Sequence, residues 1–219
     1  MKPIIFFDLD DVFYLTGAYI DTNMTAYLRN SKGMDHADRL MLNQLFIPKQ
    51  DFLTLREDLE HTDPATAKII DERVWEHGLK RTTFISEAKP DEELRQYVLR
   101  LLVNKEVDLG ICTHRLSIDK DGSLTQAALA RDYSGIQFKH VYMLDRKTHP
   151  NKVAYLQKQH GAFVLVDDNP IFGETALDTD SRLIIWDKQH TIPRYINQRK
   201  ASDVIKLDHH INDLLFPKG

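Results

Sequence analysis

Short runs of mainly apolar residues recur along the chain, and several end abruptly at a polar or acidic residue. The first run, residues 4–7, stops at Asp8, and the run at 163–166 stops at Asp167. Apolar runs of this length are typical of strands that are buried on both faces of a parallel sheet. The sequence predicts strands at residues 4–7, 107–112, 141–144, 163–166 and 182–186, with a weaker one at 204–207.

Between these runs the apolar positions recur every three or four residues, which is the spacing of a helix with one buried face. The clearest case begins at Pro90 with the sequence PDEEL, because proline and acidic residues suit the first turn of a helix. The predicted helices are residues 13–30, 34–45, 49–61, 65–77, 90–104, 124–131 and 150–160, with a final helix near 209–216.

Strands that alternate with helices from residue 90 onward predict an α/β fold, a Rossmann-like parallel sheet flanked by helices. A strand–helix–strand unit needs only about 30 residues, yet the first two strands are separated by on the order of 70 more. That excess is helical in pattern, so we expect an inserted helical cap over the carboxyl ends of the strands. The expected domains are a core of residues 1–18 and 86–219 and a cap of residues 19–85.

Composition narrows the class of protein. The 219 residues are 42% hydrophobic and 28% charged, which suits a folded chain with a hydrophobic core. The net charge of −4 provides no positive field to bind a long nucleic acid. The single cysteine, Cys112, lies in an apolar run, so we expect it to be buried and the compartment to be reducing and cytoplasmic. No stretch approaches the ~18 apolar residues of a membrane span. The pattern leaves the oligomeric state open.

The acidic residues after the first strand are the first candidates for chemistry. Asp8 and Asp10 are separated only by Leu9, and because side chains alternate along an extended chain, both face the same side. Ligands of parallel sheets bind just past the carboxyl ends of the strands, where these two residues emerge. One carboxylate can act as a nucleophile while the other carries a proton, and both offer oxygen ligands to Mg²⁺. An isolated pair of this kind is also found in ordinary acidic turns.

Four sequence signals then follow in a fixed order: FFDLDDV around Asp8, LGICT ending at Thr113, Lys152 near a helix start, and VLVDDNP with Asp167 and Asp168. Together they resemble the four motifs of the haloacid dehalogenase (HAD) superfamily of phosphohydrolases, and the resemblance covers the whole chain. It implies an enzyme that hydrolyses phosphomonoesters with Mg²⁺ through an aspartyl-phosphate intermediate.

The resemblance also implies a role for each motif residue. Asp8 would attack phosphorus, and Asp10 would protonate the leaving oxygen and then activate water. Thr113 would donate its hydroxyl to a phosphoryl oxygen, and Lys152 would neutralise charge on the nucleophile and the phosphoryl group. Lys147, five residues upstream, is the alternative motif lysine, because the spacing before the fourth motif varies in the family.

The metal site implied by the resemblance contains Asp8, Asp167 and Asp168 together with Asp10, which contributes its backbone carbonyl. Which of Asp167 and Asp168 binds the metal directly stays open. Two further residues, His114 and Arg115, directly follow Thr113 and are candidates for contacts with phosphate or substrate, or for a surface role.

The substrate is the least determined feature. The small helical cap and the paired aspartates of the fourth motif are similar to those of the 5'(3')-deoxyribonucleotidases, although Asp11 stands where many relatives have glycine. A nucleoside monophosphate is therefore the favoured partner. The alternatives are a phosphatase of sugar phosphates or other small metabolites, a 3'-phosphatase of nucleic-acid ends, and a phosphate-binding protein without catalysis. The acidic balance argues against the nucleic-acid reading.

Overall fold

The computed structural model describes residues 2–30, 52–77, 82–104, 106–170, 182–188, 190, 192 and 198–217. The chain divides into two compact units, one of Met1–Leu15 with Lys89–Gly219 and the other of Thr16–Ala88. We call the first the core unit and the second the helical unit. The predicted helix at 34–45 lies outside the described residues.

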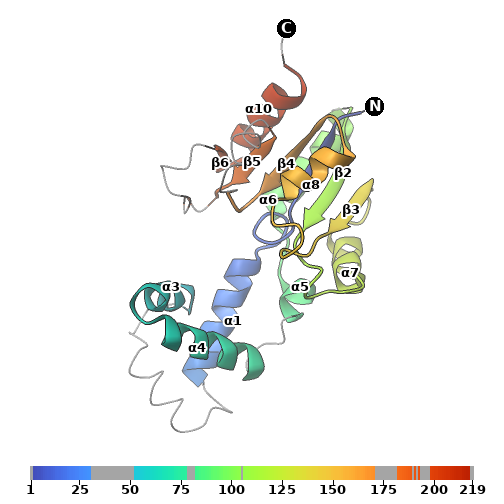
Figure 1. The fold of residues 1–219 in the computed structure, drawn as a ribbon. Helices are drawn as coiled ribbons and strands as arrows, with labels where there is room; N and C mark the ends of the chain where they lie inside the picture. Colours follow the sequence, from blue (N-terminus) through green and yellow to red (C-terminus); the bar gives the residue numbers. More distant parts are fainter. Residues whose placement is uncertain are drawn as a thin grey trace. The chain divides into compact units, whose positions relative to one another are not determined.

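The core unit is built on a six-stranded sheet in the order β3-β2-β1-β4-β5-β6, with every neighbouring pair parallel (Figure 1). This confirms the predicted α/β class with a parallel sheet. Phe7 at the end of β1 lies opposite Ile111 of β2 and Val166 of β4, so these three strands end nearly in step. The strands are β1 (Ile4–Phe7), β2 (Asp108–Thr113), β3 (His140–Met143), β4 (Phe163–Asp167), β5 (Leu183–Trp186) and β6 (Arg199–Ala201).

The strand order places the site. The chain runs from β1 through β2 to β3 on one side of β1, and then continues with β4, β5 and β6 on the other side. The direction of progress therefore reverses between β1 and β4. In open parallel sheets the crevice at the carboxyl ends of the strands beside such a reversal is where ligands bind.

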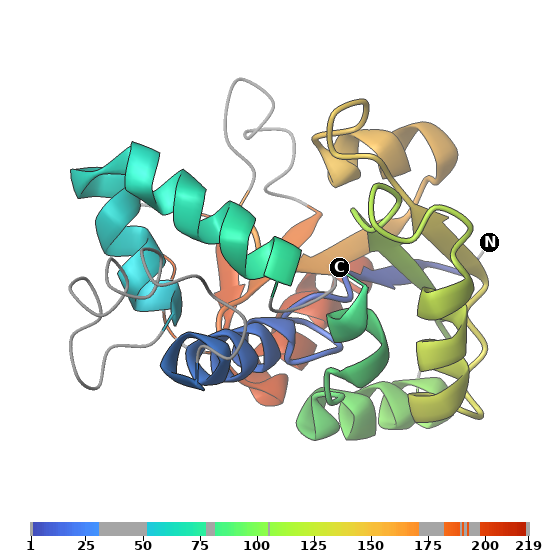
Figure 2. The same cartoon turned by 90° about the horizontal axis from the view of Figure 1, so that it is seen from below.

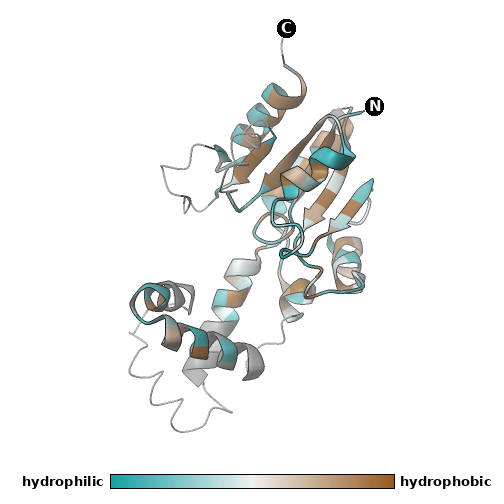
Figure 3. Ribbon diagram, in the orientation of Figure 1, coloured by the Kyte–Doolittle hydropathy of each residue, from teal (hydrophilic) through white to brown (hydrophobic). Residues whose placement is uncertain are grey.

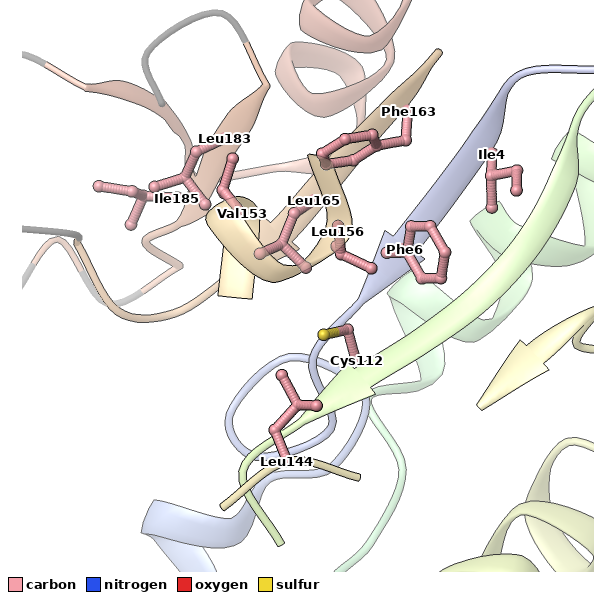
Figure 4. Close-up of a cluster of buried hydrophobic side chains, with 10 residues drawn as sticks. All are labelled: Ile4, Phe6, Cys112, Leu144, Val153, Leu156, Phe163, Leu165, Leu183 and Ile185. Atoms are coloured by element: carbon pink, nitrogen blue, oxygen red, sulfur yellow. The ribbon is translucent and has the colours of Figure 1, made fainter. Parts of the chain in front are cut away.

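Helices cover both faces of the sheet, with α8 on one side and α6 and α10 on the other (Figure 2). Apolar residues dominate the central strands (Figure 3), as expected for a doubly covered sheet. Val153 and Leu156 of α8 pack onto a buried cluster that includes Phe6 and Cys112 (Figure 4). The helices of this unit are α6 (Glu92–Asn104), α7 (Ser123–Asp132), α8 (Lys152–Gln159) and α10 (Val204–Leu215).

Gly110 in β2 allows the close packing of this cluster. A Cβ atom at Gly110 would lie 2.3 Å from Cε1 of the Phe6 ring, a distance that real side chains do not reach. The ring of Phe6 therefore rests directly against the backbone of β2, which locks β1 and β2 together beneath the site. The prediction that Cys112 is a buried core residue is confirmed.

The helical unit contains α1 (Thr16–Asn30), α3 (Phe52–Thr62), α4 (Pro64–His77) and α5 (Thr83–Glu87). Asp63 separates α3 from α4, and its carboxylate accepts hydrogen bonds from the backbone N–H of Thr66 at 3.2 Å and from its hydroxyl at 2.6 Å. Pro64 then starts α4, as predicted for a proline at a helix start. None of the helices in the described part of the chain is long and apolar enough to cross a membrane.

The C-terminal region differs from the prediction. The strand predicted at 204–207 is wrong, because α10 begins at Val204 and the last strand, β6, precedes it. Asp203 caps the helix, since its side chain accepts a hydrogen bond from the backbone N–H of Lys206 at 2.9 Å. Leu207 and Ile211 are buried at helical spacing while Ile205 is 81% exposed. The short apolar run therefore belongs to an amphipathic helix. The short helix α5 was also not predicted.

Candidate active site

The carboxyl edge of the sheet gathers the predicted motif residues. Asp8 directly follows β1, and its backbone N–H donates to the carbonyl of Val166 at 2.8 Å, which fixes it beside the end of β4. Thr113 is the last residue of β2 and Asp167 is the last residue of β4. All three side chains are buried, so the site is a desolvated group of polar residues over an apolar sheet.

Lys152 is the cation that holds two of these carboxylates. It is the first residue of α8, whose start is capped by the Asn151 side chain. Its Nζ lies 2.7 Å from Oδ2 of Asp8 and 2.8 Å from Oδ2 of Asp167, and its side chain is only 4% exposed. Lys147 is instead exposed on the preceding loop. The structure thus places Lys152, of the two candidate lysines, against the carboxylates.

The buried charges perturb one another strongly. Burial alone would raise the pKa of Asp8, but the charge of Lys152 and its hydrogen bond hold that pKa below its usual value. Burial likewise opposes the charge of Lys152, yet Asp167 and Asp8 raise its pKa above the ordinary value. Asp8 is therefore an anion and Lys152 a cation at neutral pH. A carboxylate kept ionised in a dry site is suited to nucleophilic attack.

Three carboxylates fit a divalent cation. Oxygen atoms of Asp8, Asp167 and Asp168 lie within 4.8 Å of one another. Burial, with the charges of Asp167 and Asp8, raises the pKa of Asp168 to about 9, so Asp168 is protonated at neutral pH and its ionisation would add an excess of negative charge that Lys152 does not offset. A hard cation with oxygen ligands would relieve that excess, and Mg²⁺ is the metal whose ligand preference these residues match. The donor set therefore fits the metal that the sequence predicts.

The carboxylate of Asp10 is held apart from this cluster. Both of its oxygens accept from the guanidinium of Arg115, from Nε to Oδ2 at 3.0 Å and from Nη2 to Oδ1 at 2.5 Å. The Arg115 side chain is 1% exposed, whereas that of Asp10 is 33% exposed. Arg115 was predicted as a substrate contact, and the structure shows it in a bidentate pair with Asp10. Asp10 thus presents a half-buried carboxylate beside the dry Asp8 site.

A pocket of about 220 Å³ opens at this edge and is lined in part by His114, Arg146, Lys152, Asp167 and Asn169. Its lining combines cationic, acidic and amide groups, the chemistry expected for a bound anion beside a metal. Arg146 was not predicted from the sequence. Its position two residues past the apolar run at 141–144 could have indicated it, because residues just past a strand end lie at the edge where ligands bind.

His114 contributes a fixed imidazole to the pocket. Its Nε2 lies 2.8 Å from the carbonyl oxygen of His149, and because a carbonyl only accepts, Nε2 carries the proton. Burial and, after it, the charge of Lys152 lower the pKa of His114, so the ring is neutral at pH 7. Its Nδ1 is then an acceptor, buried and without a hydrogen-bond partner among the described residues.

Other buried side-chain atoms of the described residues also lack a hydrogen-bond partner, among them Oδ1 of Asp8 and Oγ1 of Thr113. Buried polar atoms are nearly always satisfied, and unsatisfied ones in native proteins mark functional positions or ligand sites. These two atoms are a carboxylate oxygen that can act as a nucleophile and a hydroxyl that can donate, at the ends of adjacent strands. A phosphoryl group bound between them would accept from the hydroxyl and present its phosphorus to the carboxylate oxygen.

Solved structures show which fold this site belongs to. Neither a protein-family model nor a curated protein sequence matches the chain. YfnB from Bacillus subtilis, solved with bound magnesium, is 15% identical with a TM-score of 0.54 over 96% of this chain and 99% of its own. A HAD family hydrolase from Deinococcus radiodurans, with bound phosphate and sodium, is 15% identical with a TM-score of 0.54 over 99% of both chains.

A third similar structure is that of a dehalogenase. L-2-haloacid dehalogenase from Xanthobacter autotrophicus, with chloropropionic acid covalently bound, is 13% identical with a TM-score of 0.52 over 97% of this chain and 99% of its own. At such identities the likeness establishes the fold and not the reaction. The chain therefore has the HAD hydrolase fold, with its cap region, over nearly its full length.

Proposed function

We propose that this protein is a Mg²⁺-dependent phosphomonoester hydrolase that works through an aspartyl-phosphate on Asp8. The observation that carries the proposal is the buried ion pair of Asp8 with Lys152, beside Asp167 and Asp168. It holds a carboxylate anionic and sets it next to a group of metal ligands. A phosphate dianion repels an anionic nucleophile. Attack on it therefore requires both an ionised carboxylate and nearby cations that reduce the repulsion.

The chain's own residues divide the reaction into two steps. In the first, Asp8 forms a bond to phosphorus while the bond from phosphorus to the leaving oxygen breaks, and Asp10 gives that oxygen a proton. In the second, a water oxygen attacks phosphorus and passes a proton to Asp10, and the bond from phosphorus to Asp8 breaks. Orthophosphate leaves, and both carboxylates return to their starting states.

The remaining residues stabilise charge during both steps. Lys152 faces the negative charge that passes between Asp8 and the phosphoryl oxygens, and the hydroxyl of Thr113 can donate to one of those oxygens. Asp8, Asp167, Asp168 and the carbonyl of Asp10 would hold Mg²⁺. When bound, the ion supplies charge neutralisation of the phosphate and acts as a Lewis acid.

Dehalogenation is the second reaction found on this fold, and two features of the chain argue against it. Chloride leaves without a proton, so dehalogenation would not require a proton donor in the position of Asp10. An alkyl halide is uncharged at the reacting carbon, so dehalogenation would not require a metal ion bound by Asp8, Asp167 and Asp168. Both features are expected for an alkoxide leaving group on a phosphate.

For the substrate, the proposal is a nucleoside 5'- or 3'-monophosphate, with the helical unit as the cap that contacts the nucleoside. The core pocket of about 220 Å³ is smaller than the ~300–1,000 Å³ of typical small-molecule pockets, so it suits the phosphate and little more. The helical unit, Thr16–Ala88, lies in the chain between Asp8 and Thr113. Interdomain movement in YfnB, whose structure is similar, supports a cap that opens and closes.

A substrate screen tests the proposal. The purified chain is assayed with nucleoside monophosphates, sugar phosphates, para-nitrophenyl phosphate, a 3'-phosphorylated oligonucleotide and chloropropionate, with Mg²⁺ and with EDTA. We expect release of phosphate that requires Mg²⁺, is lost in the Asp8→Asn variant, and is fastest for a nucleoside monophosphate. Preference for sugar phosphates would overturn the nucleotidase proposal alone. Chloride release, or no phosphate release from folded protein, would overturn the phosphatase proposal.

A further inference from the structure

The pair between Arg115 and Asp10 joins the ends of two adjacent strands. Asp10 lies in the loop after β1, and Arg115 lies two residues past the end of β2. Nε and Nη2 of one guanidinium meet the two oxygens of one carboxylate, at 3.0 and 2.5 Å. A planar fork that contacts both oxygens fixes the rotation of the carboxylate as well as its position, which a lysine could not do.

The surroundings hold the guanidinium in place. It lies 5.6 Å from the ring centroid of Tyr14, a cation–π distance, and the side chain of Arg115 is 1% exposed. The backbone N–H of Tyr14 donates to the carbonyl of Leu9 at 2.9 Å, which folds the loop back over Asp10. Past the end of β2, the carbonyl of Arg115 accepts from the N–H groups of Ile118 and Asp119. Arg115 is therefore anchored through its own backbone, and Asp10 through that of the neighbouring Leu9.

Asp10 must be held in place because a cation bound at the neighbouring carboxylates would attract its side chain. It is two residues from Asp8, which belongs to the cluster of three carboxylates that fits a divalent cation. A free carboxylate on a 33% exposed side chain could turn and coordinate that cation itself. It would then be unable to exchange a proton with a leaving oxygen. The carboxylate of Asp10 is not among the oxygens of the described cluster, and both of its oxygens are with Arg115 instead.

We propose that Arg115 is a positioning residue for Asp10, which aims its carboxylate at the leaving group and keeps it away from the metal ligands. The inference rests on the proposed phosphatase function. It makes Arg115 part of the proton-transfer machinery through Asp10, and not a ligand of the phosphoryl group. The consequence is a specific signature: loss of Arg115 should matter in proportion to how much the leaving oxygen needs a proton.

The experiment measures kcat/KM for a series of phosphomonoesters whose leaving groups range from para-nitrophenol, which needs no proton, to simple alkyl alcohols. Arg115→Lys and Arg115→Met are compared with the wild type in Mg²⁺. We expect kcat/KM to fall about 10²- to 10³-fold for alkyl esters, which is no more than the usual cost of losing a general acid. For para-nitrophenyl phosphate the fall should be under about 10-fold, because this leaving group needs no proton. Arg115→Lys should recover only part of the loss, because it cannot hold both oxygens.

A double variant and a matched control separate positioning from general damage. Adding Arg115→Met to Asp10→Asn should cost the alkyl esters little beyond Asp10→Asn alone, since the arginine acts through Asp10. Tyr97→Phe removes a partly buried hydrogen bond of 2.9 Å from Tyr97 of α6 to Asp208 of α10, and it should leave the leaving-group series unchanged. Thermal unfolding of each variant identifies any that fails to fold. If Arg115→Met fails to fold, Arg115→Lys still provides the test, because it keeps a cation at the site.

Binding of inorganic phosphate gives a readout that does not depend on turnover. It should be unchanged in Arg115→Lys if the arginine positions Asp10. Equal losses across the leaving-group series, together with weaker phosphate binding, would overturn the inference and make Arg115 a phosphate ligand. If the wild type itself hydrolyses none of the esters, the proposed function fails first, and the two failures are thereby distinguished.

Discussion

Asp8 and Asp10 stand two positions apart in the chain, yet the regions around them differ in burial and in the cation that each carboxylate meets. The Asp8 side chain is 5% exposed and shares Lys152 with Asp167, whereas that of Asp10 is 33% exposed and has Arg115 on both oxygens. The first region is dry and rich in carboxylates, as a nucleophile and metal site requires. The second reaches solvent, as the proposed proton transfer to a leaving group and from water would require.

Under the proposed function, one short loop serves two kinds of chemistry. A lysine ammonium is a compact charge that two carboxylates can share, so it tolerates the approach of a third group such as a metal or phosphate. An arginine fork occupies one carboxylate and fixes its orientation. The cation, and not the carboxylate, therefore distinguishes the two regions.

The largest effect is expected from Asp8→Asn, which leaves the shape of the dry region intact and removes its nucleophile. An amide cannot form the bond to phosphorus, so kcat should fall on the order of 10⁵- to 10⁶-fold, as for loss of the nucleophile in other covalent enzymes. The loss should be equal for good and poor leaving groups. Circular dichroism and thermal unfolding check the fold, and near wild-type turnover would refute the assignment.

Asp10→Asn should produce a smaller and more selective loss. Removal of a general acid and base typically costs about 10²- to 10⁴-fold, and alkyl phosphates should lie near the upper end of that range. With para-nitrophenyl phosphate the first step should be nearly normal, so the phosphorylated protein should accumulate because water activation is slow. Rapid-quench kinetics would detect that burst. A uniform loss in the first step for all leaving groups would speak against Asp10 as the acid.

Lys152→Met tests the shared cation of the dry region. It leaves Asp8 and Asp167 buried without their partner, so the free energy of unfolding measured without metal should fall by about 3–5 kcal/mol. Loss of charge stabilisation should also lower kcat about 10²- to 10³-fold.

Lys147→Met is the matched control, because Lys147 is exposed on the loop before α8. Its stability should change by no more than about 0.5 kcal/mol. Similar effects of the two substitutions, measured by chemical denaturation and steady-state kinetics, would remove Lys152 from the account.

The smallest effect is expected from an ion pair at the opposite edge of the sheet. Lys139 precedes β3, and its Nζ lies 2.5 Å from Oδ2 of Asp108 at the start of β2, with the lysine half exposed. Exposed pairs contribute about 0–1 kcal/mol, so Lys139→Met should barely change stability and should leave kcat unchanged. A kinetic defect here would mean that charge at large, and not the two local cations, determines activity.

The sequence predicted the parts of this site that depend on local pattern. Asp8, Thr113 and Asp167 were placed because a strand end is visible as the point where an apolar run stops, and parallel strands bring such points to one edge. Lys152 was favoured by its order in the chain, and the structure brings it onto both carboxylates.

Features that depend on long-range geometry or weak patterns were missed. The pairing of Arg115 with Asp10 joins residues 105 positions apart, and no local pattern encodes it. The strand β6 has the sequence RKA, too polar to be recognised as a strand, and the apolar run beside it belongs to α10. Asp203 ahead of that run was the available signal, because aspartate is a favoured helix cap.

Oxygen from water, followed during a single turnover, tests most directly whether Asp8 is the nucleophile. With excess protein over a phosphomonoester in water enriched in heavy oxygen, attack of water on phosphorus places the heavy oxygen in released phosphate and none in Asp8. Mass spectrometry of the phosphate and of the peptide containing Asp8 measures both. We expect label in phosphate only, with a phosphorylated Asp8 peptide trapped by acid quench. Label in the Asp8 carboxylate, as hydrolysis of a carbon ester would give, or no phosphorylated peptide at any time, would contradict this expectation.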